Sequence, residues 1–211
     1  GEVKYPLERF GSDNVSLAGI LTDLCGRAGL SQTDILTNEV GQSVHGYVMS
    51  RRASARDAIE PLLGAYFIDA AETDGVLRFI PRGQELTATI PYDDLGAVEG
   101  TSNDNPLRVT ETRTQELELP QRIDLTHYDP DRDYQSNTQN AARASNAVTT
   151  KDQQTVELPI ALSADEAAQI ADKTLTSAWI GRNQYEFNLP PKWLRLDPTD
   201  VIDVLLPDAT L

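Results

Sequence analysis

The sequence predicts an α+β fold: a small α+β unit, with helices and a β-hairpin, is joined to a β-rich, barrel-like unit with one long helix. Two patterns predict this fold. Apolar residues recur at helical spacing in three segments, and short runs of alternating apolar and polar residues lie between them. A chain of 211 residues, 39% hydrophobic and 24% charged, can bury its own core. We assign residues 1–100 to the first unit and 101–211 to the second, which we expect to be incomplete at its C-terminal end.

The first unit opens with a predicted helix at about residues 15–27, where apolar residues recur every three or four positions. A short strand is expected at residues 44–49. A second helix begins at Ser54, whose hydroxyl can accept a hydrogen bond from an amide of the first turn. Pro61 lies inside this helix and has no amide donor, so we expect a kink or an early end there.

A β-hairpin is predicted after the second helix. Residues 66–70 and 76–80 are rich in strand-forming side chains, and an Asp-Gly pair lies in the segment between them. Glycine accepts the positive φ that a tight hairpin turn requires, which makes this pair a good turn signal. A further strand at residues 86–90 should lead into a polar loop at 91–106.

The second unit begins with two predicted strands, at residues 108–116 and 122–128, interrupted at Pro120. The following stretch, residues 129–154, contains almost no large apolar side chains. Such a segment cannot bury enough surface to offset the entropy lost on ordering. We therefore expect residues 129–154 to form either a mobile loop or an arm that orders only against a neighbouring subunit.

The strongest helix signal in the chain follows a predicted strand at residues 156–162. Ser163 and Glu166 have the spacing of a capping box at the start of a helix at about 164–180, so capping explains this glutamate without catalysis. Two more strands are expected, at residues 185–189 and 201–206.

Charge and hydropathy exclude several classes of function. The formal net charge is -15, from 33 acidic and 18 basic residues. Proteins that bind nucleic acids gain affinity from Lys and Arg, so specific nucleic-acid binding is not expected. An acidic surface suits a channel through which DNA passes without sticking, although solubility alone also explains it. No apolar run reaches the length of a membrane-spanning helix, so no stable membrane insertion is expected.

No catalytic, cofactor or metal site is expected. Cys25, the single cysteine, lies on the apolar side of the first helix, as a buried residue would. His45 and His127 lack the neighbours of a catalytic triad. Residues 129–133 have the alternating acidic start of a calcium loop, but the Gly and Glu required at its sixth and twelfth positions are missing.

Two groups of side chains could serve binding instead. Basic residues cluster before the second helix, at Arg51, Arg52 and Arg56. They could meet an acidic partner or form an ordinary solvated face. Aromatic residues gather in the last third of the chain, at Trp179, Tyr185 and Trp193. These indicate packing between helix and strand, with stacking on a carbohydrate as the alternative.

Five blocks of sequence resemble a known family. They are GYVMS at residues 46–50, SARDAIEPLL at 54–63, DGVLRFIPRG at 74–83, PQRIDLTHYDPDRDYQ at 120–135 and LPPKWLRLDPTDV at 189–201. As an ordered set they resemble the hub region of phage tail proteins. These are the large tail-tip proteins of phages with long non-contractile tails and of gene transfer agents.

The resemblance implies a homotrimeric hub that joins the distal tail to the tip and fibres, with β-barrel domains around the DNA channel and α+β domains outside them. It implies a structural module of the virion, located at the tail tip, made in the host cytoplasm and taken from a longer polypeptide. Its partners would be copies of itself and other distal-tail, tail-tip or fibre proteins. We expect no enzymatic activity and no cofactor. A host-surface glycan-binding module is the alternative function, and a peptidoglycan-cleaving enzyme is a third, although no hydrolase motif is present.

Overall fold

The structure is a computed structural model that describes residues 15–49, 53–96, 108–144 and 149–206. It confirms the α+β class, with three α-helices and several open sheets among these residues. The helices are α1 Leu17–Arg27, α2 Ala55–Tyr66 and α3 Ala164–Ile180. The strands are β1 Val15–Ser16, β2 Ile35–Leu36, β3 Ser43–Val44, β4 Gly46–Tyr47, β5 Ile68–Thr73, β6 Val76–Pro81, β7 Leu86–Ile90, β8 Thr110–Arg113, β9 Pro120–Asp129, β10 Gln135–Ala142, β11 Asp152–Ala161, β12 Asn183–Glu186 and β13 Val201–Val204.

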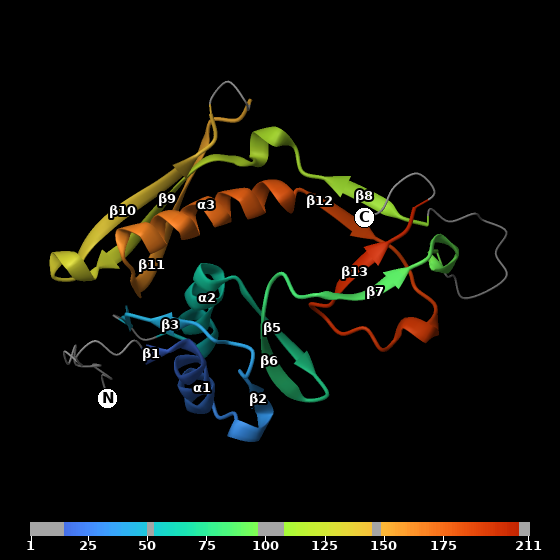
Figure 1. Cartoon of the computed structure of the whole chain (residues 1–211), viewed down its shortest axis with the longest axis horizontal. Helices are drawn as coiled ribbons and strands as arrows, with labels where there is room; N and C mark the ends of the chain where they lie inside the picture. Colours follow the sequence, from blue (N-terminus) through green and yellow to red (C-terminus); the bar gives the residue numbers. More distant parts are fainter. Residues whose placement is uncertain (1–14, 50–52, 97–107, 145–148, 207–211) are drawn as a thin grey trace.

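The largest sheet has the strand order β10-β9-β11-β4, and α3 lies along it against β9 and β10 (Figure 1). The two central strands, β9 and β11, run parallel, while the edge strands pair antiparallel with their neighbours. In β9 the alternate residues Ile123, Leu125 and His127 are buried. Because side chains alternate across a strand, one face of β9 therefore belongs to the core.

The main hydrophobic core contains residues from both sides of position 100. Leu21 of α1, Leu62 of α2, Leu125 of β9 and Ile160 of β11 are all completely buried in this one cluster. Strand β4 also pairs with β11, at Tyr47 and Ile160. The division of the chain into two units near residue 100 stays a prediction, but the two sides share this core.

A smaller core lies around β7 and β13, which pair side by side (Figure 1). Ile90, Leu95 and Val204 are buried in it, and Phe187 and Trp193 are among the partly buried residues that pack against them. These five residues come from distant parts of the sequence, so this core forms only after the chain has folded back on itself.

The second helix does not end at Pro61, and the predicted early end is wrong. Helix α2 continues from Ala55 through Pro61 to Tyr66. Proline removes one hydrogen bond, the one that its amide would have donated in the preceding turn. The turn after Pro61 stays helical because Leu62 and Ala65 are packed in the main core. Tertiary packing therefore outweighs the local preference.

The prediction of a mobile loop, or of an arm ordered only by a neighbouring subunit, at residues 129–154 is wrong for the described part of this segment. Within it, Gln135–Ala142 forms the edge strand β10, which pairs with β9 along its whole length. The first residues of β11 also fall in this segment, while residues 145–148 lie outside the described part. The side chains of β10 bury little surface, but its backbone hydrogen bonds complete one edge of β9, and Ala141 packs against the main core.

Other boundaries differ by a few residues. The predicted strand 44–49 is split into β3, which pairs with β1, and β4, which pairs with β11. The predicted strand 185–189 lies earlier, as β12, because Phe187 and Leu189 leave the strand to pack in the smaller core. The hairpin is confirmed: β5 and β6 are joined by Asp74 and Gly75, both with positive φ.

The capping box of α3 leads to a stability prediction. The Ser163 hydroxyl accepts a hydrogen bond from the Glu166 amide, and the Glu166 carboxylate accepts one from the Ser163 amide at 2.9 Å. Ser163→Ala should lower the free energy of unfolding by about 1 kcal/mol, because it leaves a helix amide without its acceptor. Chemical denaturation measures this. Ser177→Ala, at an exposed position of the same helix, is the matched control and should change stability by less than about 0.5 kcal/mol.

Candidate assembly surfaces

Two small sheets near the smaller core have open edges. Strand β7 pairs in parallel with β13, and β8 pairs antiparallel with β12. In the described part of the chain no further strand extends either pair. The amide of Gly96 donates to the carbonyl of Asn188 at 3.1 Å, which ties the β7 side to the segment after β12. A two-stranded sheet has little stability of its own in water, so both pairs present edges onto which further strands can add.

The outer edge of β10 is another open edge. Its eight residues, Gln135–Ala142, include no charged side chain and no proline. Exposed edge strands usually carry such residues, because they discourage pairing with other chains. The edge of β10 therefore lacks the usual protection, and no strand covers it among the described residues.

A cluster of cations and aromatic rings lies beside the smaller core, and we call it the cationic patch. Its members are Tyr92, Arg108, Lys192, Trp193 and Arg195. The Arg108 guanidinium lies 4.5 Å from the centroid of the Tyr92 ring, and that of Arg195 lies 5.5 Å from the centroid of the Trp193 ring. The sequence did not reveal this cluster, because Arg108 is distant from the other two cations along the chain.

One carboxylate organises the cationic patch. Asp94 accepts hydrogen bonds from Lys192 Nζ at 2.6 Å and from Trp193 Nε1 at 2.9 Å. The hydrogen bond from Lys192, aided by that from Trp193, lowers the pKa of Asp94. Lys192 is thereby neutralised. Within the described residues no ion pair joins Arg108 or Arg195 to a carboxylate.

Of the three residues in the basic cluster predicted before α2, the structure describes only Arg56. Arg51 and Arg52 lie outside the described residues. Arg56 is exposed on the first turn of α2. The structure therefore does not test whether the three side chains come together.

Trp179 contacts two other segments of the chain. Its Nε1–H donates to the carbonyl of Pro120 at 2.8 Å, and the Arg143 guanidinium lies 4.4 Å from its ring centroid. Arg143 in turn donates its amide to the carbonyl of Gln121 at 2.9 Å. Trp179 thus connects the end of α3 to the start of β9 and to the segment after β10. These contacts explain the residue by packing, and the Arg143 side chain covers part of the ring that a sugar would need.

The three predicted aromatics have separate partners. The Tyr185 hydroxyl, on β12, lies 3.4 Å from Glu111 on β8. Trp193 packs on the smaller core and bonds Asp94. Among the interactions of the described residues, neither Tyr185 nor Trp193 shares one with Trp179, so these contacts give the carbohydrate interpretation no support.

The residues considered for catalysis or metal binding, Cys25, His45 and His127, also lie apart. Cys25 is buried in the main core, and burial raises the pKa of its thiol, which disfavours the reactive thiolate. His127 is buried in β9, with its Nε2 lacking a hydrogen-bond partner in the described structure. The His45 Nε2 lies 3.4 Å from the Glu166 carboxylate. Across the described ranges, no group of three or more His, Cys, Asp or Glu residues could hold a metal ion.

The acidic run that resembled a calcium loop is a structured turn, which we call the acidic tip (residues 129–134). The Asp129 carboxylate is buried and accepts hydrogen bonds from the Asp131 amide at 3.0 Å and from Asn137 Nδ2 at 2.9 Å. Arg132 lies 3.7 Å from the same carboxylate. The Asp129 carboxylate therefore stabilises the turn, whereas the Asp131 and Asp133 side chains are exposed to solvent.

The surface of the described part includes two shallow hollows that could be considered as sites. The larger, about 600 Å³, is lined mainly by α1 and the segment up to Thr37, with an Asp23–Arg27 ion pair on its rim. The smaller, about 190 Å³, lies between α2 and α3 and is lined in part by Tyr66 and Glu166. Burial, together with the charge of Glu166, raises the pKa of Tyr66 to about 12. Neither hollow gathers the residues of a recognisable catalytic site.

Glu166 leads to a prediction about pH. Burial raises its pKa, but hydrogen bonds from Ser163 and the nearby His45 outweigh this, and the net pKa lies below the ordinary 4.5. A lowered folded-state pKa stabilises the protein above the unfolded-state value, and this contribution is lost as the pH falls through the folded-state value. Glu166→Gln should therefore be less stable than the wild type near neutral pH, with the gap closing as the pH falls below 4.5. Denaturation midpoints measured across this range test it; a gap that does not change with pH would contradict it.

Comparisons with known proteins agree with this picture of a structural module. Residues 54–210 match the family model described as "Putative phage tail protein". No curated protein matches the chain. In the described part, no helix is long and apolar enough to cross a membrane.

Three solved structures share the fold. A chain of the virion of a native gene transfer agent particle is 28% identical, with a TM-score of 0.81 over 92% of this chain and 42% of that one. The tail protein from Neisseria meningitidis MC58 is 11% identical (TM-score 0.63; 94% of this chain and 60% of that one). The 43 kDa tail protein of prophage MuSo2 from Shewanella oneidensis is 10% identical (TM-score 0.59; 93% and 58%). This chain thus spans less than two thirds of each of them. Since the family model covers most of its residues, the chain belongs to this family of phage tail proteins.

Proposed function

We propose that the chain is a hub module that joins the distal tail tube to the tail tip and assembles there as a homotrimer. The observation that supports this most is the pair of two-stranded sheets beside the smaller core. Sheets of this size need further strands for stability, and their edges invite pairing. Strands from neighbouring subunits, or from the rest of a longer chain, would complete them around the tail channel. The similarity to a chain of a gene transfer agent virion supports a place in an assembled particle.

We also propose that the assembled module surrounds the channel through which DNA passes. With a net charge of -15, the surface repels DNA and favours its passage over its retention. Specific binding to nucleic acid is not part of the proposal, because such binding needs clusters of Lys and Arg that neutralise phosphates. The proposed partners are copies of this chain and other distal-tail, tail-tip or fibre proteins, and the proposed site of synthesis is the host cytoplasm.

The proposed role is structural and does not include catalysis. Cys25 is buried and the two histidines lie in separate places, so the described side chains suggest no reaction. Zymography on cell-wall substrate is the direct measurement. Clearing of the substrate by the purified chain would favour the peptidoglycan-cleaving alternative and count against the proposal.

A density map of an intact particle that contains this protein tests the hub proposal. We expect three copies at the distal end of the tail, with the β7–β13 and β8–β12 pairs continued by strands of other subunits or of the same polypeptide. Light scattering of the purified chain at micromolar concentration is the complementary measurement. Copies located elsewhere in the particle, or a monomer that joins no tail component, would contradict the proposal.

A further inference from the structure

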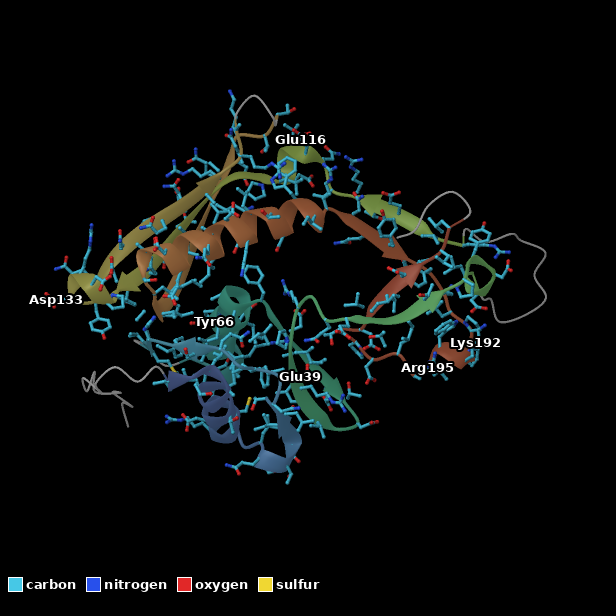
Figure 2. All side chains as sticks on the ribbon, in the orientation of Figure 1. Glu39, Tyr66, Glu116, Asp133, Lys192 and Arg195 are labelled. Carbon is cyan, nitrogen blue, oxygen red and sulfur yellow. The ribbon has the colours of Figure 1, made fainter. Side chains whose placement is uncertain are left out.

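We propose that copies of this chain associate head to tail, with the acidic tip of one copy against the cationic patch of the next. The inference rests on the self-assembly proposed above and adds the contact that would build it. The two surfaces lie near opposite ends of the molecule: Figure 2 shows Asp133 at one end of the long axis and Lys192 and Arg195 toward the other. They therefore cannot meet within one chain. Each copy offers both halves of a contact, and contacts of this kind close into a ring when the rotation between copies allows it.

The acidic tip presents carboxylates that the chain itself does not use. Among the described residues no ion pair joins Asp131 or Asp133 to a cation. Asp133 and Tyr134 both have positive φ, 51° and 59°. Aspartate adopts this left-handed conformation more readily than most residues other than glycine, so the turn is compatible with the sequence. The turn is held by the buried Asp129, whose carbonyl accepts the Tyr134 amide at 2.9 Å.

The cationic patch presents the complementary groups. Asp94 neutralises Lys192. Arg108 lies against the Tyr92 ring and donates from Nη1 to the Tyr92 carbonyl at 2.9 Å, and Arg195 lies against the Trp193 ring. Both guanidinium groups keep further N–H donors for a carboxylate. Leu194, between the cations of the patch, has 84% of its surface exposed. On the tip, Tyr134 is 41% exposed. The two surfaces therefore match in charge, carboxylate to guanidinium, and also in an apolar contact of Tyr134 with Leu194.

The charge of the whole chain favours this pairing over others. Two copies that each carry -15 repel one another across most orientations. An orientation that places Asp131 and Asp133 against Arg108 and Arg195 replaces repulsion by attraction. Arg132 belongs to the tip as well, but it faces the buried Asp129 at 3.7 Å, so the exposed carboxylates still dominate the tip. Charge complementarity of this kind selects orientation and partner.

Directed disulfide formation tests the contact even if it is weak. Two single-cysteine proteins are made in a Cys25→Ser background, one with Asp133→Cys and the other with Leu194→Cys, and are mixed in equal amounts under mild oxidation. We expect mixed dimers well above the share given by random pairing. Glu60→Cys, at an exposed position on α2, is the matched control and should pair at random with either protein.

Charge reversal then identifies the groups responsible. Adding Arg195→Glu to the Leu194→Cys protein should lower the initial rate of mixed-dimer formation at least about tenfold, because like charges would then face each other. Adding Asp131→Arg to the Asp133→Cys protein as well should restore it. Random pairing in every mixture would overturn the head-to-tail contact. If the wild type is then still oligomeric by light scattering, only this contact fails, whereas a monomer in both assays would also contradict the proposed self-assembly.

Discussion

Leu125→Ala should lower the free energy of unfolding by about 3 kcal/mol, within the range for removing a buried leucine side chain. Leu125 is completely buried in β9, and its cluster includes residues of α1, α2, β11 and α3. Truncation removes apolar contacts and leaves a cavity that a close-packed core can fill only in part. Because both sides of residue 100 contribute to this core, we expect the whole described structure to lose stability together.

Denaturant unfolding followed by two probes measures this effect. Both tryptophans, Trp179 and Trp193, lie after residue 100, so their fluorescence reports on the second half of the chain. Far-UV circular dichroism also reports on α1 and α2. Coincident transitions, both shifted by Leu125→Ala, are expected. Leu117→Ala is the control, since that side chain is 64% exposed and its truncation should change stability by less than about 0.5 kcal/mol. Separate transitions, with the fluorescence transition alone shifted, would favour two independent units divided near residue 100.

Trp179→Ala should have an effect of similar size, about 3 kcal/mol, at the low end for truncating a large aromatic because the ring is only partly buried. The substitution removes the hydrogen bond to the Pro120 carbonyl and the contact with Arg143, and so loosens the end of α3 from β9. Trp179→Phe keeps an aromatic ring near Arg143 but loses the N–H donor and part of the indole surface, so it should cost less than Trp179→Ala, about 1–2 kcal/mol.

The same pair of variants separates packing from recognition. If Trp179 packs the structure, stability falls in the order wild type, Trp179→Phe, Trp179→Ala, as measured by thermal and chemical denaturation. If its purpose were to stack on a carbohydrate, Trp179→Ala would leave stability unchanged and abolish binding on a glycan array. The second outcome would contradict the role assigned here and favour the glycan-binding alternative.

The helices show how much of the fold could be predicted from the sequence. Helix α3 begins and ends where its capping box and its apolar spacing indicate, because both signals involve residues within a few positions of one another. The β5–β6 hairpin was also predictable, since the turn at Asp74 and Gly75 depends on the conformations of these two residues. Helix α2 was predicted less well, because the local effect of Pro61 is outweighed by packing that the sequence does not display.

The candidate surfaces show where such prediction stops. The aromatic residues were identified from the sequence, but the partners of Trp179 and Trp193, which are Pro120 and Asp94, are far from them along the chain. The cationic patch was missed for the same reason, whereas the basic cluster that was predicted lies partly outside the described residues. Strand β10 was missed because its polar side chains give no apolar alternation; its order comes from hydrogen bonds to β9.

By itself, then, the sequence determined the α+β class, the three helices, the hairpin and an acidic character that disfavours specific binding to nucleic acid. These properties follow from local spacing, turn chemistry and net charge. Only the tertiary structure decided which strands pair and which sheet edges stay open. It also brought Arg108 into the same cationic patch as Lys192 and Trp193. The physical reason is that strand pairing and surface charge depend on contacts between residues far apart in the chain, for which a sequence of alternating or polar residues specifies no partner.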